Sequence, residues 1–252
     1  MHLWRLPIVL VAGLMAGAVN SIAGGGTLIT FPTLVWTGLN PIVANATSTL
    51  ALWPGYVSGA VGFRRELRGT RRTFLLLAGP SLLGGLAGGI LLLHTGMRTF
   101  NVVVPFLVLG ATVLLAMQGL RPVPSVPPLQ GRARILGAVA FQFAAGVYGG
   151  YFGGVLGFVL LVGFGFMAMR DQLQMSGLKN ATTVLINGTA LAYFIASGAV
   201  RWPEGLVMAA GAIAGGFAGA TLSRRVGSRP VRRVVIALGF AVSIALLVRA
   251  FA

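Results

Sequence analysis

The stretch 20-NSIAGGGTLITFP-32 places three consecutive glycines inside an apolar run that otherwise suits a helix. Each glycine in a helix interior costs about 1 kcal/mol relative to alanine. Glycine also accepts positive φ angles at no steric cost, so a glycine triplet is a natural place for the chain to unwind or reverse. The sequence therefore predicts a break at residues 24–26, followed by a short helix that begins near Thr27.

The composition around this break is that of a membrane protein. Of the 252 residues, 56% are hydrophobic and 9% are charged, and the mean hydropathy is +0.90. Soluble domains carry about 25% charged residues, and a bilayer-spanning helix needs roughly 20 apolar residues. We predict an all-α polytopic membrane protein with apolar segments at residues 6–23, 26–38, 42–63, 73–93, 99–119, 134–149, 154–168, 178–200, 204–222 and 231–251.

The charge balance points to membrane topology rather than to nucleic acid. The net charge is +16, and the chain has three acidic residues, which the pattern places in loops: Glu66, Asp171 and Glu204. Basic residues that flank spans set their orientation, so no nucleic-acid partner is expected. There is no cysteine, no nucleotide-binding phosphate loop and no acidic residue in a predicted span. We therefore expect no enzyme activity, cofactor or metal.

The chain reads as two similar halves, residues 1–120 and 134–252, joined by a Pro-rich linker over residues 121–133. The first half contains the break at 24–26, a short helix, and the motif 45-NATST-49 at the expected start of a long span. In the second half the corresponding features are 149-GGYFGG-154, a short helix from Val155, and 180-NATTV-184. Paired glycine-interrupted segments in two halves are typical of a transporter binding site.

Charge placement predicts how the halves are oriented. If residues 6–38 and 134–168 are re-entrant hairpins, 15 of the 19 basic residues lie on one face and four on the other. The positive-inside rule makes the first face cytoplasmic, which puts both termini outside and makes the halves inverted repeats, each a hairpin followed by three spans. If residues 6–38 are instead one full crossing, the count becomes 16 against three, so charge leaves this alternative open.

The breaks also predict a binding site. Two short helices that start at mid-membrane would present free N–H groups and positive dipole ends there, and such ends bind anions. We expect the two breaks to meet. Close helix packing is the competing interpretation of glycine clusters, and it accounts for 84-GGLAGG-89 and 215-GGFAGA-220.

Polar side chains on the same elements extend the predicted site. Asn and Thr are common helix N-caps, but capping explains only one residue of each motif. Lys179, the sole lysine, either holds an anion at the cytoplasmic mouth or is an interfacial residue with its ammonium in water. The predicted substrate-binding residues are Asn20, Ser21, Gly24, Gly25, Gly26, Thr27, Asn45, Thr47, Ser48, Thr49, Gly153, Gly154, Lys179, Asn180, Thr182, Thr183 and Asn187.

The segment 24-GGGTLITFPTLVWTGLNPIVANATSTLALWPGYVSGAVGFRREL-67 resembles the TauE/SafE family of sulfite and organosulfur-anion exporters. Members similarly have a glycine-polar break, an apolar half-helix, and a helix that opens on Asn-Thr-Ser and ends in basic residues. The segment 179-KNATTVLINGTALAYFIASGAVRW-202 looks like the second repeat of that family. By resemblance, substrate contacts fall on Gly25, Gly26, Asn45, Thr47, Ser48, Asn180, Thr182 and Thr183. The glycine-aromatic break at 149–154 departs from the compact glycine-polar motif expected there.

The sequence thus predicts a secondary transporter in the bacterial inner membrane that exports small anions such as sulfite or sulfonates. The resemblance supplies the substrate class; the residues alone supply an anion site. An anion channel, or an importer of another small carboxylate or sulfur anion, is the alternative, and a structural scaffold is the remaining one. The expected partners are the anion and the lipid bilayer, and the sequence leaves a homodimer open.

Overall fold

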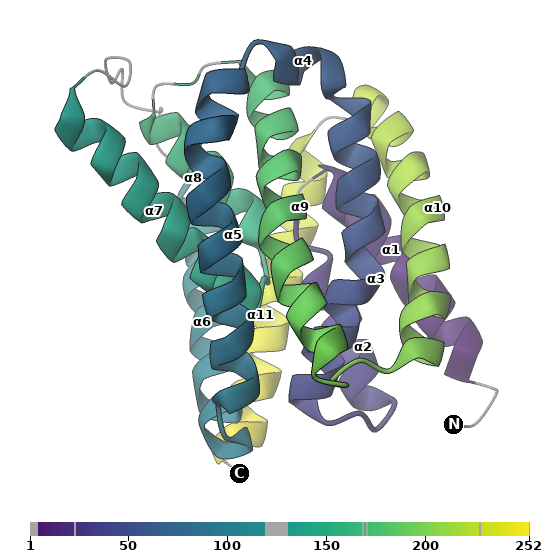
Figure 1. Ribbon diagram of the computed structural model, residues 1–252. Helices are drawn as coiled ribbons and strands as arrows, with labels where there is room; N and C mark the ends of the chain where they lie inside the picture. Colours follow the sequence, from purple (N-terminus) through teal and green to yellow (C-terminus); the bar gives the residue numbers. More distant parts are fainter. Residues whose placement is uncertain are drawn as a thin grey trace.

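The computed structural model describes residues 5–22, 24–118, 131–167, 169, 171–226 and 228–251, and within them the chain is helical, with no strand (Figure 1). The helices are α1 Leu6–Ile22, α2 Thr27–Trp36, α3 Pro41–Gly62, α4 Arg64–Arg68, α5 Arg71–His94, α6 Met97–Gln118, α7 Arg132–Tyr151, α8 Leu156–Phe166, α9 Gln172–Ala196, α10 Trp202–Val226 and α11 Ser228–Phe251. The expected all-helical class is confirmed. Most of the predicted linker, residues 121–130, lies outside the described residues, and α7 already begins at Arg132.

The starts of α3 and α9 differ from the sequence prediction. Asn40 caps α3, accepting a hydrogen bond from the Ile42 N–H, and Pro41 occupies the first turn. Asp171 caps α9 through the N–H groups of Leu173 and Gln174. The two Asn-Ala-Thr motifs therefore lie inside α3 and α9 rather than at their starts, and the capping interpretation of these motifs is wrong.

The first two helices form a hairpin, because α1 begins and α2 ends at the same end of the bundle. The Arg5 guanidinium donates to the Thr37 carbonyl at 2.6 Å, which joins these two points directly. The α7–α8 pair is built in the same way in the second half, and α7 starts at the opposite end of the molecule from α1 (Figure 1).

The helices of the two halves make corresponding packing contacts. Helix α1 packs on α10 as α7 packs on α5, and α3 packs on α10 as α9 packs on α5. Each half-helix packs on the long helix that follows it, α2 on α3 and α8 on α9. Helices α3 and α9 also pack on each other, as do α6 and α11. The main contacts are thus preserved when the first set of helices is swapped for the second.

Glycines allow the closest of these helix contacts. A Cβ added to Gly88 of α5 would lie 2.2 Å from the Val147 carbonyl oxygen of α7. A Cβ added to Gly215 of α10 would lie 1.9 Å from the Leu14 carbonyl oxygen of α1. The packing interpretation of the clusters at 84–89 and 215–220 is therefore confirmed at these positions.

Many large apolar side chains are exposed on the surface, and the largely apolar interior also contains polar side chains. Large apolar side chains are exposed on the outside, among them Val11, Leu83, Leu136 and Phe217, whereas amide and hydroxyl side chains are buried between the helices. By length and composition, α5 is the one helix in the described ranges that is apolar enough to cross a membrane by itself; α1, α2, α6, α8 and α11 contain shorter apolar stretches.

Candidate functional site

The first break separates α1 from α2 at the predicted glycines. Gly24 has φ +81°, a backbone conformation that favours glycine, and its N–H donates back to the Val19 and Asn20 carbonyls at the end of α1. Gly26 precedes α2 without any side-chain cap. The N–H groups of Gly25 and Gly26 have no backbone acceptor within the described residues, so they are available to a ligand.

The second break is shorter than the sequence suggests. Gly149 and Gly150 belong to α7, and the chain leaves the helix at Phe152 and Gly153, the latter with φ +70°. The pair Gly153–Gly154 is thus the counterpart of Gly24–Gly25, and the departure of 149-GGYFGG-154 from a compact motif disappears. Val155, which precedes α8, has φ +62°, although it is β-branched. Such conformations cost about 1–3 kcal/mol and cluster at functional sites.

The first break lies against the first turn of α8, three residues beyond the predicted second break at 149–154. A Cβ added to Gly24 would lie 3.0 Å from the Gly157 Cα, and one added to Gly157 would lie 3.1 Å from the Gly24 Cα. Gly157 is in the first turn of α8, so the chain reversal of the first half rests against the beginning of the second half-helix. Neither position has room for a side chain.

The polar residues of α3 do not all face the same space. Asn45 donates its amide to the carbonyl of Tyr151, the last residue of α7, at 2.9 Å, and its own Oδ1 is buried without a partner in the described ranges. Ser48 shares a hydrogen bond of 2.5 Å with Thr30 of α2. Thr49 bonds only to the Asn45 carbonyl of its own helix.

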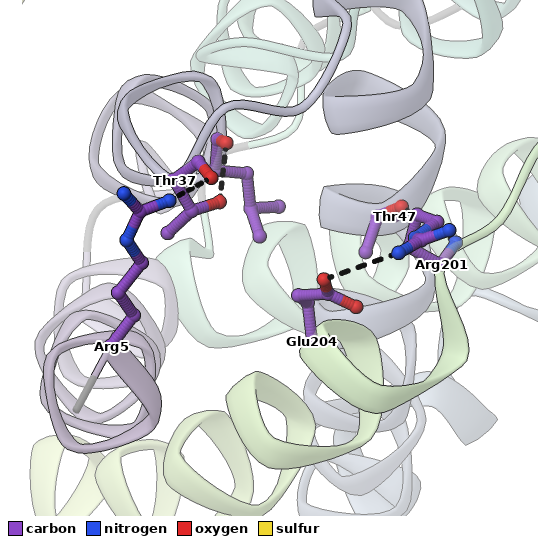
Figure 2. Close-up of polar contacts among 6 residues, drawn as sticks. Arg5, Thr37, Thr47, Arg201 and Glu204 are labelled. Atoms are coloured by element: carbon purple, nitrogen blue, oxygen red, sulfur yellow. Dashed lines mark hydrogen bonds and ion pairs between the residues drawn. The ribbon is translucent and has the colours of Figure 1, made fainter. Parts of the chain in front are cut away.

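Thr47 serves a different contact from the substrate contact predicted for it. Its hydroxyl accepts the Arg201 N–H at 3.1 Å, which ties α3 to the loop between α9 and α10 (Figure 2). The Arg201 guanidinium in turn lies 3.9 Å from the Glu204 carboxylate. The sequence places Glu204 in a loop, but it is in the first turn of α10 and its side chain is 3% exposed, compared with 57% for Arg201.

The polar residues of α9 line the other side of the breaks. Thr183 is buried, and its hydroxyl has no partner in the part of the chain that the structure describes, whereas Thr182 donates to the Leu178 carbonyl of its own helix. Asn187 lies beside the second break, with its Oδ1 4.0 Å from a Cβ added to Gly153. The Ser21 side chain lies outside the described part of the chain.

Lys179 differs most from expectation. The sequence leaves it either at the cytoplasmic mouth or at the membrane interface with its ammonium in water, but the side chain is 2% exposed. Its Cδ would lie 3.2 Å from a Cβ added to Gly157. The interfacial interpretation is therefore wrong, because the Lys179 side chain packs where the two breaks meet.

A cavity of about 500 Å³ leads towards this region from the end of the bundle that carries α4. Two predicted residues, Asn20 and Asn180, line it. Tyr56, whose hydroxyl donates to Asn20 at 3.3 Å, and Glu66 of α4 also line it and were not predicted. The remaining lining residues are Gly17, Leu52, Gly55, Ser58, Gly59, Gly62, Phe63, Leu173, Ala212, Gly216 and Phe217.

The opposite end of the bundle is held closed by the contacts of Figure 2. Arg5 joins α1 to the end of α2, and Arg201 joins the α9–α10 loop to α3. Behind them, Phe31 packs edge-on against both Phe100 and Phe152. The described part of the structure thus has a cavity towards α4 and a packed layer on the other side of the breaks.

Comparison with known proteins shows which family the chain belongs to. The family model described as sulfite exporter TauE/SafE matches residues 9–246, almost the whole chain. The chain belongs to the TauE/SafE family. This confirms the resemblance seen in the sequence, and it makes the chain an all-helical member of a family of membrane transporters.

Relatives of the TauE/SafE protein are similar over nearly their full lengths. A probable membrane transporter protein of Haemophilus influenzae is 27% identical, covering 93% of this chain and 91% of the relative. The probable membrane transporter protein YfcA of Escherichia coli K12 is 28% identical, covering 96% and 89%. The probable membrane transporter protein ORF9 of a Sinorhizobium species is 26% identical, covering 96% and 92%. No solved structure matches this TauE/SafE chain.

Proposed function

We propose that this protein is a secondary transporter that exports small anions, such as sulfite, sulfoacetate and related sulfonates, across the bacterial inner membrane. The observation that carries the proposal is the contact between Gly24 and Gly157, which brings together two half-helix starts that have no side-chain cap. A cavity lined by Asn20 and Asn180 lies on the adjoining parts of α1 and α9. Unpaired N–H groups and positive dipole ends favour a negative solute. The family name and those of the relatives favour transport over a scaffold.

The arrangement of the helices supports two inverted repeats. The exchange of contacts between α1–α3, α5 and α6 and their counterparts α7–α11 is the packing expected of repeats related by an axis in the membrane plane. The apolar outer surface suits lipid, and the buried amides and hydroxyls suit a pathway. With the arginine-rich α4 end in the cytoplasm, both termini lie outside.

In this orientation the structure is an inward-open state. The cavity that reaches Asn20 and Asn180 faces the cytoplasm, and the layer of Arg201, Thr47 and Glu204 closes the external side. Export then requires that the cavity close and the external layer open around the same anion, which is alternating access.

The membrane potential can drive this export without a titrating group in the pathway. An interior-negative potential favours outward movement of an anion by about 2.3 kcal/mol per elementary charge for each 100 mV. The sequence contains no nucleotide-binding phosphate loop, so direct ATP coupling is not part of the proposal. Catalysis is not part of it either, since the buried polar groups at the breaks are amides, hydroxyls and a single amine.

The test is efflux from proteoliposomes loaded with sulfite or with a sulfonate, under an imposed potential. We expect efflux that saturates with anion concentration and rises with an interior-negative potential. Empty liposomes and a neutral sulfone of similar size are the controls. Absence of saturable transport for every small anion tried would refute the proposal, and a non-saturating flux would make the protein a channel.

The orientation is tested separately with a single cysteine, since the natural chain has none. Ser58→Cys lies in the cavity wall and should react with a membrane-impermeant thiol reagent from the cytoplasmic side. The anion should slow this reaction. Labelling from the external side alone would reverse the assigned direction.

A further inference from the structure

Lys179 has a buried side chain whose ammonium has no counter-ion among the described residues. Its side chain is 2% exposed, and within the described part of the chain no side chain forms a hydrogen bond or an ion pair with the ammonium. None of the three acidic residues forms an ion pair with it in the described part of the chain: Asp171 caps α9 and Glu204 faces Arg201. Glu66 of α4 lines the cavity together with Asn180. A buried charge without a partner is strongly unfavourable.

The Lys179 side chain lies beside the start of α8. The Lys179 Cδ comes within 3.2 Å of a Cβ added to Gly157, in the first turn of this helix. Val155 precedes the helix without a side-chain cap, and the Gly154 and Gly157 N–H groups have no backbone acceptor among the described residues. The start of α8, a helix of eleven residues, therefore lies beside a lysine side chain whose ammonium has no partner among the described residues, and both favour negative charge.

The wall of the cavity comes within one residue of Lys179 along the chain. Asn180, the next residue of α9, lines the cavity, while the Lys179 side chain lies against α8. Gly59 leaves space for the Asn180 side chain, since a Cβ added to Gly59 would lie 2.8 Å from the Asn180 Nδ2.

We propose that Lys179 is the counter-ion of the transported anion and binds it together with the first turn of α8. This inference rests on the proposed function and deepens it, because it replaces a site of uncharged donors with one that has a fixed positive charge. A lysine ammonium is a compact point charge with three donors, which suits a small oxyanion. Selection of anions over neutral analogues then depends on this one residue.

The proposal predicts an unusual combination of effects for Lys179→Met. Removing an uncompensated buried charge should leave the melting temperature of the anion-free protein unchanged or raise it. The rise in melting temperature that sulfite causes in the wild type, measured against chloride at equal ionic strength, should disappear. A lysine with only a structural role would give the opposite pattern, with a lower melting temperature and an intact sulfite response.

A charge-matched control separates local from global electrostatics. Arg98→Gln removes one positive charge from an exposed position of α6, away from the breaks, and should keep the sulfite response. Lys179→Arg keeps the charge and should retain at least part of it. A sulfite response in Lys179→Met equal to that of Arg98→Gln would overturn the proposal.

A second measurement uses the unmodified protein and does not depend on the variant folding. Lys179 is the only lysine, so amine acylation followed by mass spectrometry reports on it separately from the chain's α-amino group. Sulfite should slow acylation of Lys179 at least several-fold and leave the α-amino group unaffected. Equal acylation with and without sulfite, in a protein that does transport sulfite, would overturn the role of Lys179. Absence of any transport by the wild type would instead refute the proposed function.

Discussion

The Asn45 side chain donates its amide to the Tyr151 carbonyl at 2.9 Å, across 106 positions of sequence. This bond joins a motif in the first half of the chain to the break in the second half. Because Tyr151 is the last residue of α7, the bond fixes where that helix ends. The Asn45 Oδ1 is buried and has no partner among the described residues, so the same side chain still has an acceptor to offer.

Asn45→Ala should therefore impair both stability and transport. It leaves the Tyr151 carbonyl buried without its donor, which costs about 1–3 kcal/mol in the free energy of unfolding. The matched control is Asn40→Ala, which removes the cap of α3 at an exposed position and costs about 1 kcal/mol. The melting temperature should fall in both variants, whereas the rate of anion efflux should fall only in Asn45→Ala. Equal efflux in the two would assign Asn45 to the scaffold alone.

Gly24→Ala should be more harmful than glycine replacement at another positive-φ position. Gly198, in the loop between α9 and α10, has φ +67° and open space around it, so Gly198→Ala costs only the backbone term of about 1–2 kcal/mol. Gly24→Ala adds a contact of 3.0 Å with the Gly157 backbone, which forces the two breaks apart. We expect Gly198→Ala to keep its anion-dependent rise in melting temperature and Gly24→Ala to lose it. If the anion raised the melting temperature of both variants equally, the contact between Gly24 and Gly157 would not be needed for anion binding.

The breaks could be predicted from sequence because glycine runs have a local meaning. The short helices begin at Thr27 and Leu156, within a residue of the expected positions. The exact extent of the second break could not be predicted, since Gly149 and Gly150 stay helical. These two glycines are needed for tertiary packing instead: a Cβ on Gly150 would lie 2.1 Å from the Gly85 carbonyl oxygen of α5, and one on Gly149 would lie 2.6 Å from the Leu156 side chain of α8.

The burial of these charged residues could not be predicted from the sequence, because it also depends on tertiary packing. A lysine near the start of an apolar segment is ordinarily interfacial, and only the position of α8 against α9 reveals that Lys179 is enclosed. The sequence predicts a loop at Glu204, but α10 begins at Trp202 and the Glu204 side chain is buried. The burial of a side chain depends on which helices pack against each other, and the residue pattern of a single sequence does not reveal these contacts.

Two glycines of α5 should respond to alanine in opposite directions. Gly79 has open space where a Cβ would be added, so Gly79→Ala should stabilise the protein by up to about 1 kcal/mol through helix propensity. Gly88→Ala would place a methyl group 2.2 Å from the Val147 carbonyl oxygen and must push α5 away from α7. Thermal unfolding in detergent measures both. A neutral Gly88→Ala would show that the α5–α7 contact is looser than described.

Thr47→Val tests the closed end of the bundle. Valine keeps the shape of threonine but cannot accept the Arg201 N–H, so the closed state should lose about 1 kcal/mol, which corresponds to roughly a five-fold larger open fraction. Leu34→Cys, introduced at a fully buried position of α2 in a chain without cysteine, reports opening through its rate of reaction with an impermeant thiol reagent.

The control for this measurement is Thr33→Val, because the Thr33 hydroxyl bonds only to the Ile29 carbonyl of its own helix. The labelling rate of Leu34→Cys should rise about five-fold with Thr47→Val and stay unchanged with Thr33→Val. If Thr47→Val leaves the labelling rate unchanged but abolishes the sulfite response, Thr47 contacts the anion, as the sequence predicts, and closure depends on other contacts. The two outcomes are distinct because labelling is measured without anion.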